Sequence, residues 1–600
     1  MKKNYLSILM VGALFVSGCT NADYDLSDID TTARFNVNGL VVPMNIDNVT
    51  LKSVLDLKET SKVKETPSGY AIQEDGTFES DAIKVPSFST SVPQIDPIEA
   101  SINIHVANGV KATEPASVPI AYYELPTKST SFTISTDKVP KQVMDIYDVK
   151  VDAKAKCNIQ ISGLSDVLKR VRFNGIQLQL LKGFHLSSLE INGKSKDESE
   201  TDYLSSYNPQ TGILDLSAKE IVTEDGYIHI SISISSINAD EAGLEFSNPH
   251  FSISCECRLL EGGKVSVCWE DLKSISEINS LPTSIGYKCN FDVSEVDVKS
   301  FSGKIKYDVT GLNIAPVNLN DLPDLLSQPE TDVRITNPQI YIKLNNPLIQ
   351  AGYSLSAQTG FTLTANRPDE APQNYSLDEG ELVVADDADN SFVLSPIDPE
   401  ASVKADLGRT DAQHIGFKSL SDICSGKGLP KSISVTADDP QIPEQEVYDF
   451  RLGETFNPVK GNYLFFAPLN LKPGTFISYA DSIDGWNDED VDGITIEKLS
   501  LDMNVTTDVS LDMNLTVYPI VIRNGKPVID YSIAGKAYIP ASASSSPVTA
   551  ILEGTITHLD GVYISATLES KQAGKTLSPD MHINISGLKA TVTGYYDKEL

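Results

Sequence analysis

Apolar and polar residues alternate along most of the chain, and this period of two is typical of half-buried β-strands. In residues 228–234 every second residue is isoleucine, and residues 511–517 alternate Leu, Met and Val with Asp, Asn and Thr. Helical spacing is limited to short stretches, the clearest at 163–172 and 322–327, where Pro323 suits a first helical turn. The pattern predicts an all-β fold: several β-sandwich-like domains in tandem with few short helices.

The length of the chain divides this pattern into domains. A chain of 600 residues is too long for one hydrophobic core, so we expect about three or four domains. The segment 58–138 is rich in Ser, Thr and Pro and should form short strands and long loops. The predicted folded units are β domain 1 at 139–280, β domain 2 at 281–440 and a C-terminal β domain at 445–600.

Two pairs of similar strings suggest a duplication. The string at 156–162, KCNIQIS, is echoed at 288–294 by KCNFDVS, and FSNPHFSI at 246–253 is echoed at 335–342 by ITNPQIYI. Both pairs occur in the same order, although the first copy would need an insertion. These strings favour a second β domain that repeats the first. The alternative is chance similarity between two β-rich segments.

The first nineteen residues have the features of an export signal. Lys2 and Lys3 precede an apolar run at 5–16, which is shorter than the roughly 20 residues of a membrane span. Val16-Ser17-Gly18-Cys19 then resembles the lipobox of bacterial lipoproteins. The resemblance implies cleavage before Cys19 and lipidation of this cysteine. The alternative is an ordinary signal peptide that happens to contain a cysteine.

The residues after Cys19 extend this resemblance. Residues 20–32, TNADYDLSDIDTT, are acidic and without periodicity, so we expect 19–57 to be the lipidated cysteine and a tether. This stretch and the following RFNVNGLVVPMNIDNVTLKSVLDL resemble surface-exported lipoproteins of the Bacteroidetes type. The resemblance implies a lipid-anchored outer-membrane protein exposed at the cell surface. A merely polar linker is the alternative.

The charge of the chain limits its partners. With 82 acidic and 48 basic residues, the net charge is −34. Such a surface repels phosphate backbones and anionic headgroups, which argues against nucleic acid and against peripheral membrane binding. The expected contact with a membrane is therefore the lipid anchor, since more than one acyl chain holds a protein stably.

Six cysteines follow the lipobox, and their spacing is too sparse for a disulfide-held scaffold. They are Cys157, Cys255, Cys257, Cys268, Cys289 and Cys424. Residues 259–265 predict a hairpin that turns at Gly262-Gly263, and this register places Cys257 opposite Cys268. We therefore expect a disulfide between Cys257 and Cys268. A thiolate metal site at Cys255, Cys257 and Cys268 is a weaker alternative, because no neighbouring histidine or C-x-x-C pair completes it.

One acidic loop has the spacing of a metal site. Asp488, Asp490 and Asp492 precede Gly493 and match the opening of a calcium loop, with the Ile494 carbonyl as a further ligand. An EF-hand is excluded because Leu499 stands where that loop needs a bidentate glutamate. A calcium loop in a β domain, with Asp484 or Glu497 as an outside ligand, remains open beside a solvated acidic loop.

Signatures of catalysis are missing from the sequence. It contains no G-x-S-x-G, no H-E-x-x-H and no phosphate loop, and its seven histidines are scattered. Trp486 beside the acidic loop could stack on a sugar, although a core position is the commoner role of tryptophan. No spacing singles out a pair of carboxylates for glycoside hydrolysis.

The sequence therefore favours a non-catalytic role in binding, adhesion or scaffolding at the cell surface. The runner-up is an accessory glycan-binding lipoprotein of a nutrient-uptake system, and a hydrolase with a carboxylate site comes third. The partner would be a surface glycan or another protein. Exposed aromatic residues on one face would favour glycan binding, and facing carboxylates in a deep cleft would favour the hydrolase.

Overall fold

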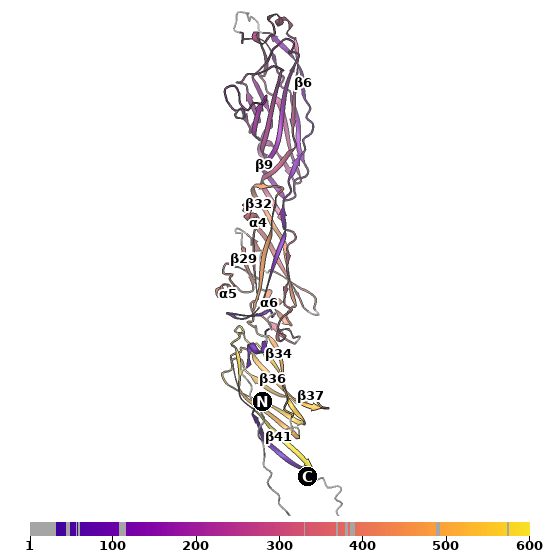
Figure 1. The fold of residues 1–600 in the computed structure, drawn as a ribbon, viewed down its shortest axis with the longest axis vertical. Helices are drawn as coiled ribbons and strands as arrows, with labels where there is room; N and C mark the ends of the chain where they lie inside the picture. The colour runs from indigo at the N-terminus through magenta and orange to yellow at the C-terminus, as the bar shows by residue number, and fades with distance from the viewer. Residues whose placement is uncertain are drawn as a thin grey trace, which may run out of the picture. The chain divides into compact units, whose positions relative to one another are not determined.

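Strands dominate the computed structural model, which confirms the all-β prediction: they account for 62% of it and helices for 7%. The residues described are 32–43, 49–55, 57, 61–106, 116–328, 330–367, 370–377, 382–384, 390–487, 493–572 and 575–599. The chain forms two compact units (Figure 1). Unit 1 comprises 1–56, 328–331 and 472–600, and unit 2 comprises 57–327 and 332–471.

The main sheet of unit 2 is built around β9 (Val143–Ser162), whose residues alternate between buried and exposed along most of the strand. Its order is β15 (Ile221–Thr223), β10 (Val171–Asn174), β19 (Lys264–Cys268), β7 (Pro119–Glu124), β6 (Ile98–Val106), β20 (Ser284–Val293), β9, β21 (Val296–Asp308), β32 (Ser432–Arg451), β26 (Ala357–Asn366) and β27 (Gln373–Ser376). Further strands pair at its sides: β5 (Phe88–Thr90), β12 (Phe184–Ile191), β16 (Tyr227–Asn238), β23 (Val317–Asn318) and β28 (Leu382–Val384).

Two smaller sheets and a short strand pair complete unit 2. One sheet has the order β13 (Tyr207–Asn208), β14 (Ile213–Leu216), β11 (Ile176–Gln179), β18 (His250–Leu259) and β17 (Glu245–Ser247), with β8 (Ser129–Thr136) on β18. The other has the order β22 (Asn313–Ile314), β4 (Gly69–Lys84), β33 (Thr455–Pro468), β25 (Gln339–Leu344), β29 (Asn390–Ser395) and β30 (Gln413–Gly416), with β3 (Val63–Thr66) on β4. The pair is β24 (Asp332–Arg334) with β31 (Ser425–Lys427).

Unit 1 is a sandwich of two antiparallel sheets. The first has the order β1 (Thr32–Pro43), β41 (His582–Glu599), β35 (Ile494–Thr507) and β39 (Ser546–Ile556), with β2 (Val49–Thr50) on β41. In the second, β40 (Leu559–Glu569) lies between β34 (Phe476–Ile483) and β36 (Asp512–Arg523), which also pairs with β37 (Lys526–Ile529) and β38 (Gly535–Ile539). Leu501 and Val505 of β35 and Met513 and Val517 of β36 are buried in the cores between these sheets.

The helices among the described residues are short and connect strands. They are α1 (Leu51–Leu55), α2 (Ala239–Ala242), α3 (Asp324–Ser327), α4 (Pro347–Gln350), α5 (Ala401–Asp406) and α6 (Leu420–Ile423), with 3₁₀ turns at Tyr203–Ser206, Trp269–Asp271 and Ile275–Ser280. The helix predicted at 322–327 is confirmed in part by α3. The helix predicted at 163–172 is wrong, because the chain turns there and then enters β10.

The expected boundary at 280/281 falls inside one sheet. β20 lies between β6 and β9, so strands assigned to two predicted domains are hydrogen-bonded neighbours. A single buried apolar cluster also draws residues from Ile83 through Phe456. Residues on both sides of the expected boundary at 280/281 therefore belong to one sheet and one core, because strands far apart in sequence pair with each other.

The other expected boundaries also differ from the two units. The segment 58–138 contains β4, a long strand paired with β33, instead of only short strands and loops. The segment 445–471 belongs to unit 2, where β33 pairs with β4 and β25. The predicted tether contains β1, which pairs with β41 in the first sheet of unit 1.

Candidate functional site

Three tyrosines form an open cluster on the second sheet of unit 1. Tyr518 of β36 lies directly opposite Tyr563 of β40, and the ring centroids are 6.4 Å apart with planes inclined by 34°. Tyr531 stands at 68° to Tyr518, with 5.1 Å between the centroids. Tyr531 is 65% exposed, and the other two are half-buried. The cluster is therefore partly open to solvent, with Tyr531 as its most exposed member.

The alternation of β36 explains why these rings point outward. Met513, Leu515 and Val517 pack into the cores, so the intervening residues lie on the opposite face of the sheet. Tyr518 continues the polar row of Asp512, Asn514 and Thr516. A tyrosine in the polar half of an alternating strand is the sequence signal for this cluster, which the sequence analysis missed.

The turn that holds Tyr531 is fixed by Asp530. The carboxylate of Asp530 accepts hydrogen bonds from the Ser532 amide at 3.1 Å and the Ser532 hydroxyl at 2.5 Å. Its other oxygen forms an ion pair with Arg523 at 2.5 Å. The hydrogen bonds from Ser532 lower the pKa of Asp530, and Arg523 contributes to this shift. These contacts pre-organise the position of Tyr531.

A polar lane leads along the sheet from the cluster to a fourth exposed tyrosine. It consists of Asn514 and Thr516 on β36 and their direct neighbours Thr567 and Ser565 on β40. Tyr538 of β38 lies opposite Asn514 and is 48% exposed. Tyr518 is four positions from Asn514, which at roughly 3.4 Å per residue separates the two aromatic ends of the lane by about 14 Å.

The side chains of the polar lane are available for a ligand. Within the described part of the chain, no hydrogen bond joins the side chains of Asn514, Thr516, Ser565 or Thr567 to the protein. In contrast, Tyr538 donates to Asp512 at 3.0 Å, and Asp512 is also ion-paired with Lys571 at 2.9 Å. The lane thus offers free hydroxyl and amide groups beside an aromatic residue whose position is fixed.

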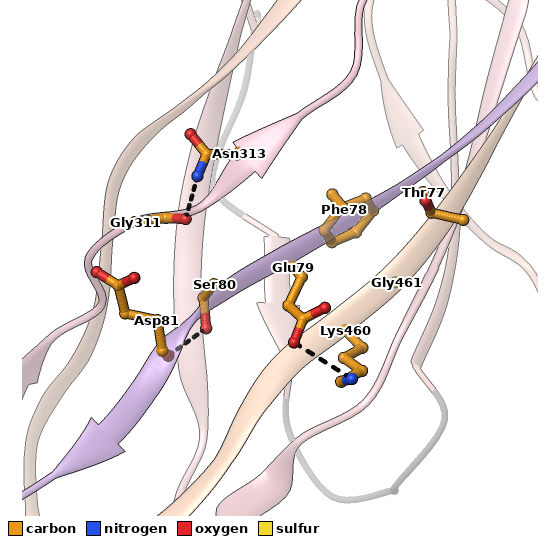
Figure 2. A pocket seen from close by; sticks show the side chains of 9 residues that line it. All are labelled: Thr77, Phe78, Glu79, Ser80, Asp81, Gly311, Asn313, Lys460 and Gly461. Atoms are coloured by element: carbon orange, nitrogen blue, oxygen red, sulfur yellow. Dashed lines mark hydrogen bonds and ion pairs between the residues drawn. The ribbon is translucent and has the colours of Figure 1, made fainter.

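Unit 2 has a shallow cavity of about 540 Å³ along β4 and β33 (Figure 2). Its polar side chains largely have partners within the protein. Glu79 pairs with Lys460 at 3.2 Å, and Thr310 donates to Asp81 at 3.3 Å. Because Glu79 and Asp81 come from the same strand, they do not oppose each other across a cleft as a hydrolase pair would.

The residues predicted to bind calcium lie largely outside the described ranges. Asp488, Asp490 and Asp492 fall between residues 487 and 493, whereas Ile494 begins β35 opposite Tyr596. Asp484 and Glu497 are exposed. Among the described residues, no three His, Cys, Asp or Glu side chains are grouped to hold a metal ion.

Trp486 is in contact with the core of unit 1. Its ring is half-buried and packs against the apolar cluster that contains Ile496 and Val562, while its amide donates to the Asp560 carbonyl at 2.7 Å. These contacts favour the core role that was the alternative to sugar stacking.

The hairpin predicted between Cys257 and Cys268 is wrong. β18 pairs with β8, β11 and β17, whereas β19 pairs with β7 and β10 in the main sheet, so the turn at 260–263 crosses between sheets. Cys257 and Cys268 are both free thiols, as are the other described cysteines, and all are buried. The run of consecutive buried residues in β19 indicates a strand covered on both faces instead of a hairpin arm.

Comparisons with known proteins add little to this geometry. No family model matches the chain, and no curated protein matches it. One solved structure that the comparison returns is that of a "putative secreted protein" from Parabacteroides distasonis, with 14% identity, a TM-score of 0.34, and coverage of 49% of this chain and 90% of that one. No helix in the described ranges is long and apolar enough to cross a membrane.

Proposed function

We propose that this protein is a non-catalytic binding protein, anchored through a lipid on Cys19 in the outer membrane and facing outward. The observation that carries the binding role is the tyrosine cluster of Tyr518, Tyr531 and Tyr563. Aromatic residues that remain exposed and are held in place contribute contact area without a large loss of side-chain freedom. The lipobox residues support the anchor, and the net charge of −34 supports a body held away from anionic headgroups.

The contacts of the carboxylates support binding over hydrolysis. Glu79 and Asp81 in the cavity of unit 2 have partners within the protein, as do Asp512 and Asp530 beside the tyrosines. General acid–base hydrolysis of a glycoside needs two carboxylates placed on either side of the scissile bond. On the sheet that carries the tyrosines, Asp512 lies opposite Glu569, but the Asp512 carboxylate is already held by Tyr538 and Lys571.

The anchor and the binding role are tested together in cells. Palmitate labelling, fractionation and protease accessibility of intact cells should show a labelled, membrane-bound and exposed protein, and Cys19→Ala should abolish the label. Tyr531→Ala should keep the label and the location, but intact cells that carry this variant should bind less of the glycan or protein partner. Labelling that survives Cys19→Ala would contradict the anchor.

A further inference from the structure

The polar lane and the aromatic residues at its two ends point to a ligand class, and this inference rests on the proposed binding role. We infer that the second sheet of unit 1 binds an uncharged oligosaccharide, which lies along the lane from Tyr518 and Tyr563 towards Tyr538. The occupant is a chain of several sugar rings and not a single sugar.

The aromatic cluster suits the apolar face of a sugar ring. The C–H groups on one side of a pyranose form an apolar patch that packs on a flat ring, while its hydroxyl groups point outward to polar partners. Tyr518 and Tyr563 supply two neighbouring rings inclined by 34°. Tyr531 stands nearly perpendicular to Tyr563, at 82°, and can border the bound ring on one side.

The polar lane suits the hydroxyl groups of the sugar. Thr516 and Ser565 form one cross-strand pair, and Asn514 and Thr567 form the next. Both pairs lie on the same face of the sheet as Tyr518. An apolar protein segment docked here would bury these polar groups without partners, which costs about 1–3 kcal/mol for each unsatisfied group. A ligand rich in hydroxyl groups can satisfy them.

The spacing sets the length of the ligand. The aromatic ends of the lane are separated by about 14 Å along the strand, which is longer than one sugar ring. A monosaccharide can therefore contact the cluster or Tyr538, but not both. An oligosaccharide can contact both ends and the polar cross-strand pairs between them.

The charges favour an uncharged ligand. Arg523 and Lys571 beside the face are ion-paired with Asp530 and Asp512. Lys536 lies opposite Thr516 and has no ion-pair partner within the described ranges, so it provides one ammonium donor at the border of the lane. A net charge of −34 on the whole chain repels a polyanionic saccharide.

The test measures binding by the full-length chain, purified in detergent. Malto-, cello-, xylo- and manno-oligosaccharides, each from the monosaccharide to the hexasaccharide, are titrated by calorimetry beside oligogalacturonates of matched length. At least one neutral series should bind, with an affinity that rises with chain length. Tyr518→Ala and Tyr531→Ala should each weaken it about tenfold, which corresponds to the stabilisation from one aromatic contact.

Two further variants locate the ligand on the sheet. Tyr538→Ala should weaken the long oligosaccharides and leave the shortest ones unchanged, because only long ligands reach that end. Thr516→Val keeps the shape of the side chain but removes its hydroxyl, and should also weaken binding. Tyr448→Ala in unit 2, where Tyr448 is 70% exposed, is the matched control and should have no effect.

The outcomes distinguish this inference from the proposed binding role. Neutral oligosaccharides that fail to bind, that bind equally well to Tyr531→Ala, or that bind more weakly than oligogalacturonates would overturn the inference. If no neutral oligosaccharide binds but Tyr531→Ala lowers the binding of a protein partner to intact cells, the proposed function stands and the saccharide inference fails. If Tyr531→Ala changes neither measurement, both fail.

Discussion

Asn158 and Asn290 lie directly opposite each other on β9 and β20, at the centre of an antiparallel pairing between the two similar strings KCNIQIS and KCNFDVS. The two copies therefore face each other within one sheet instead of occupying equivalent places in separate domains. Their cysteines lie diagonally across the pair, with 3.7 Å between the sulfur atoms of Cys157 and Cys289. The two similar strings are therefore neighbouring strands of one sheet, and they do not mark a repeated domain.

The described thiols should be unreactive in the folded protein. The contact with Cys289 and burial raise the pKa of Cys157 well above its usual value, and burial raises the pKa of Cys255 to about 12 and of Cys268 to about 11. Since the thiolate is the reactive form, iodoacetamide at pH 8 should label none of them before denaturation. Ser188→Cys, at an exposed position, provides a reactive control. Mass spectrometry of the intact protein measures the label, and native labelling as fast as that control would contradict the expectation.

Asp271→Ala should strongly destabilise unit 2. Asp271 is fully buried and accepts hydrogen bonds from Arg172 at 2.6 Å and Arg170 at 2.5 Å. Asp271→Ala removes a charge-assisted hydrogen bond from each arginine, which costs about 1.5–3 kcal/mol, although Glu220 and Glu270 remain as counter-charges. Urea unfolding followed by circular dichroism measures the change. Glu79→Ala breaks an exposed ion pair in the same unit and should cost less than about 1 kcal/mol. Similar shifts for both variants would show that burial does not determine the cost.

Gly461→Ala should destabilise the sheet that lines the cavity of Figure 2. Gly461 of β33 lies opposite Phe78 of β4, and a Cβ at Gly461 would be 2.2 Å from the Phe78 ring. Displacing that buried ring should cost about 1–3 kcal/mol, in the range of overpacked cores. Gly416→Ala in the same sheet faces open space and serves as the control, read by the same urea midpoint. An unchanged midpoint for Gly461→Ala would mean that Phe78 moves away freely.

The turn that presents Tyr531 should loosen at acidic pH. The pKa of Asp530 is lowered in the folded protein, mainly by its hydrogen bonds from Ser532, so its stabilising contribution is complete above the unfolded value of about 3.9. That contribution is lost as the pH falls through the lower, folded pKa. Hydrogen exchange of the Ser532 amide, corrected for intrinsic pH effects, should accelerate there. Asp530→Ala should show fast exchange already at pH 7, and equal protection in both proteins would exclude this role.

Calcium binding by Asp488, Asp490 and Asp492 remains a prediction with a direct thermal test. Millimolar calcium should raise the melting temperature of unit 1, because a calcium concentration of about one to ten times a Kd of about 10⁻⁴–10⁻³ M stabilises by about 0.4–1.4 kcal/mol. EDTA should reverse the shift, and Asp490→Ala should remove it. The full chain is required, since a fragment of residues 445–600 would lack β1 and β2, which pair with β41. Equal melting temperatures in calcium and in EDTA would contradict the calcium site and favour the alternative, a solvated acidic loop.

Local patterns could be predicted from the sequence more successfully than long-range pairing. The alternation of 511–517 is confirmed by β36. Asn524 and Gly525, both with positive φ, form the tight turn between the paired Arg523 and Lys526, as the local Asn-Gly preference for such turns favours. The hairpin between Cys257 and Cys268 failed because a pair of glycines allows a turn but does not choose the sheet that the chain enters next. The alternation of β36 does signal that Tyr518 is exposed, but its contact with Tyr563 could not be predicted, because register between distant strands brings these two residues together.

The pairing of β1 with β41 has a consequence for the order of folding. Thr32 lies opposite Glu599, so the strand nearest to the proposed lipid site obtains its partner only after all of unit 2 has been synthesised. Such a distant contact forms slowly, because a very long loop must close first. Until then β1 has no β41 to pair with, and an unpaired strand edge can attract other chains. A chain interrupted before residue 582 would lack β41, so the proposed lipid would be joined to an unfinished unit 1. Under the proposed anchoring, the first sheet of unit 1 is complete at the lipid end of the chain only when synthesis has reached the last strand.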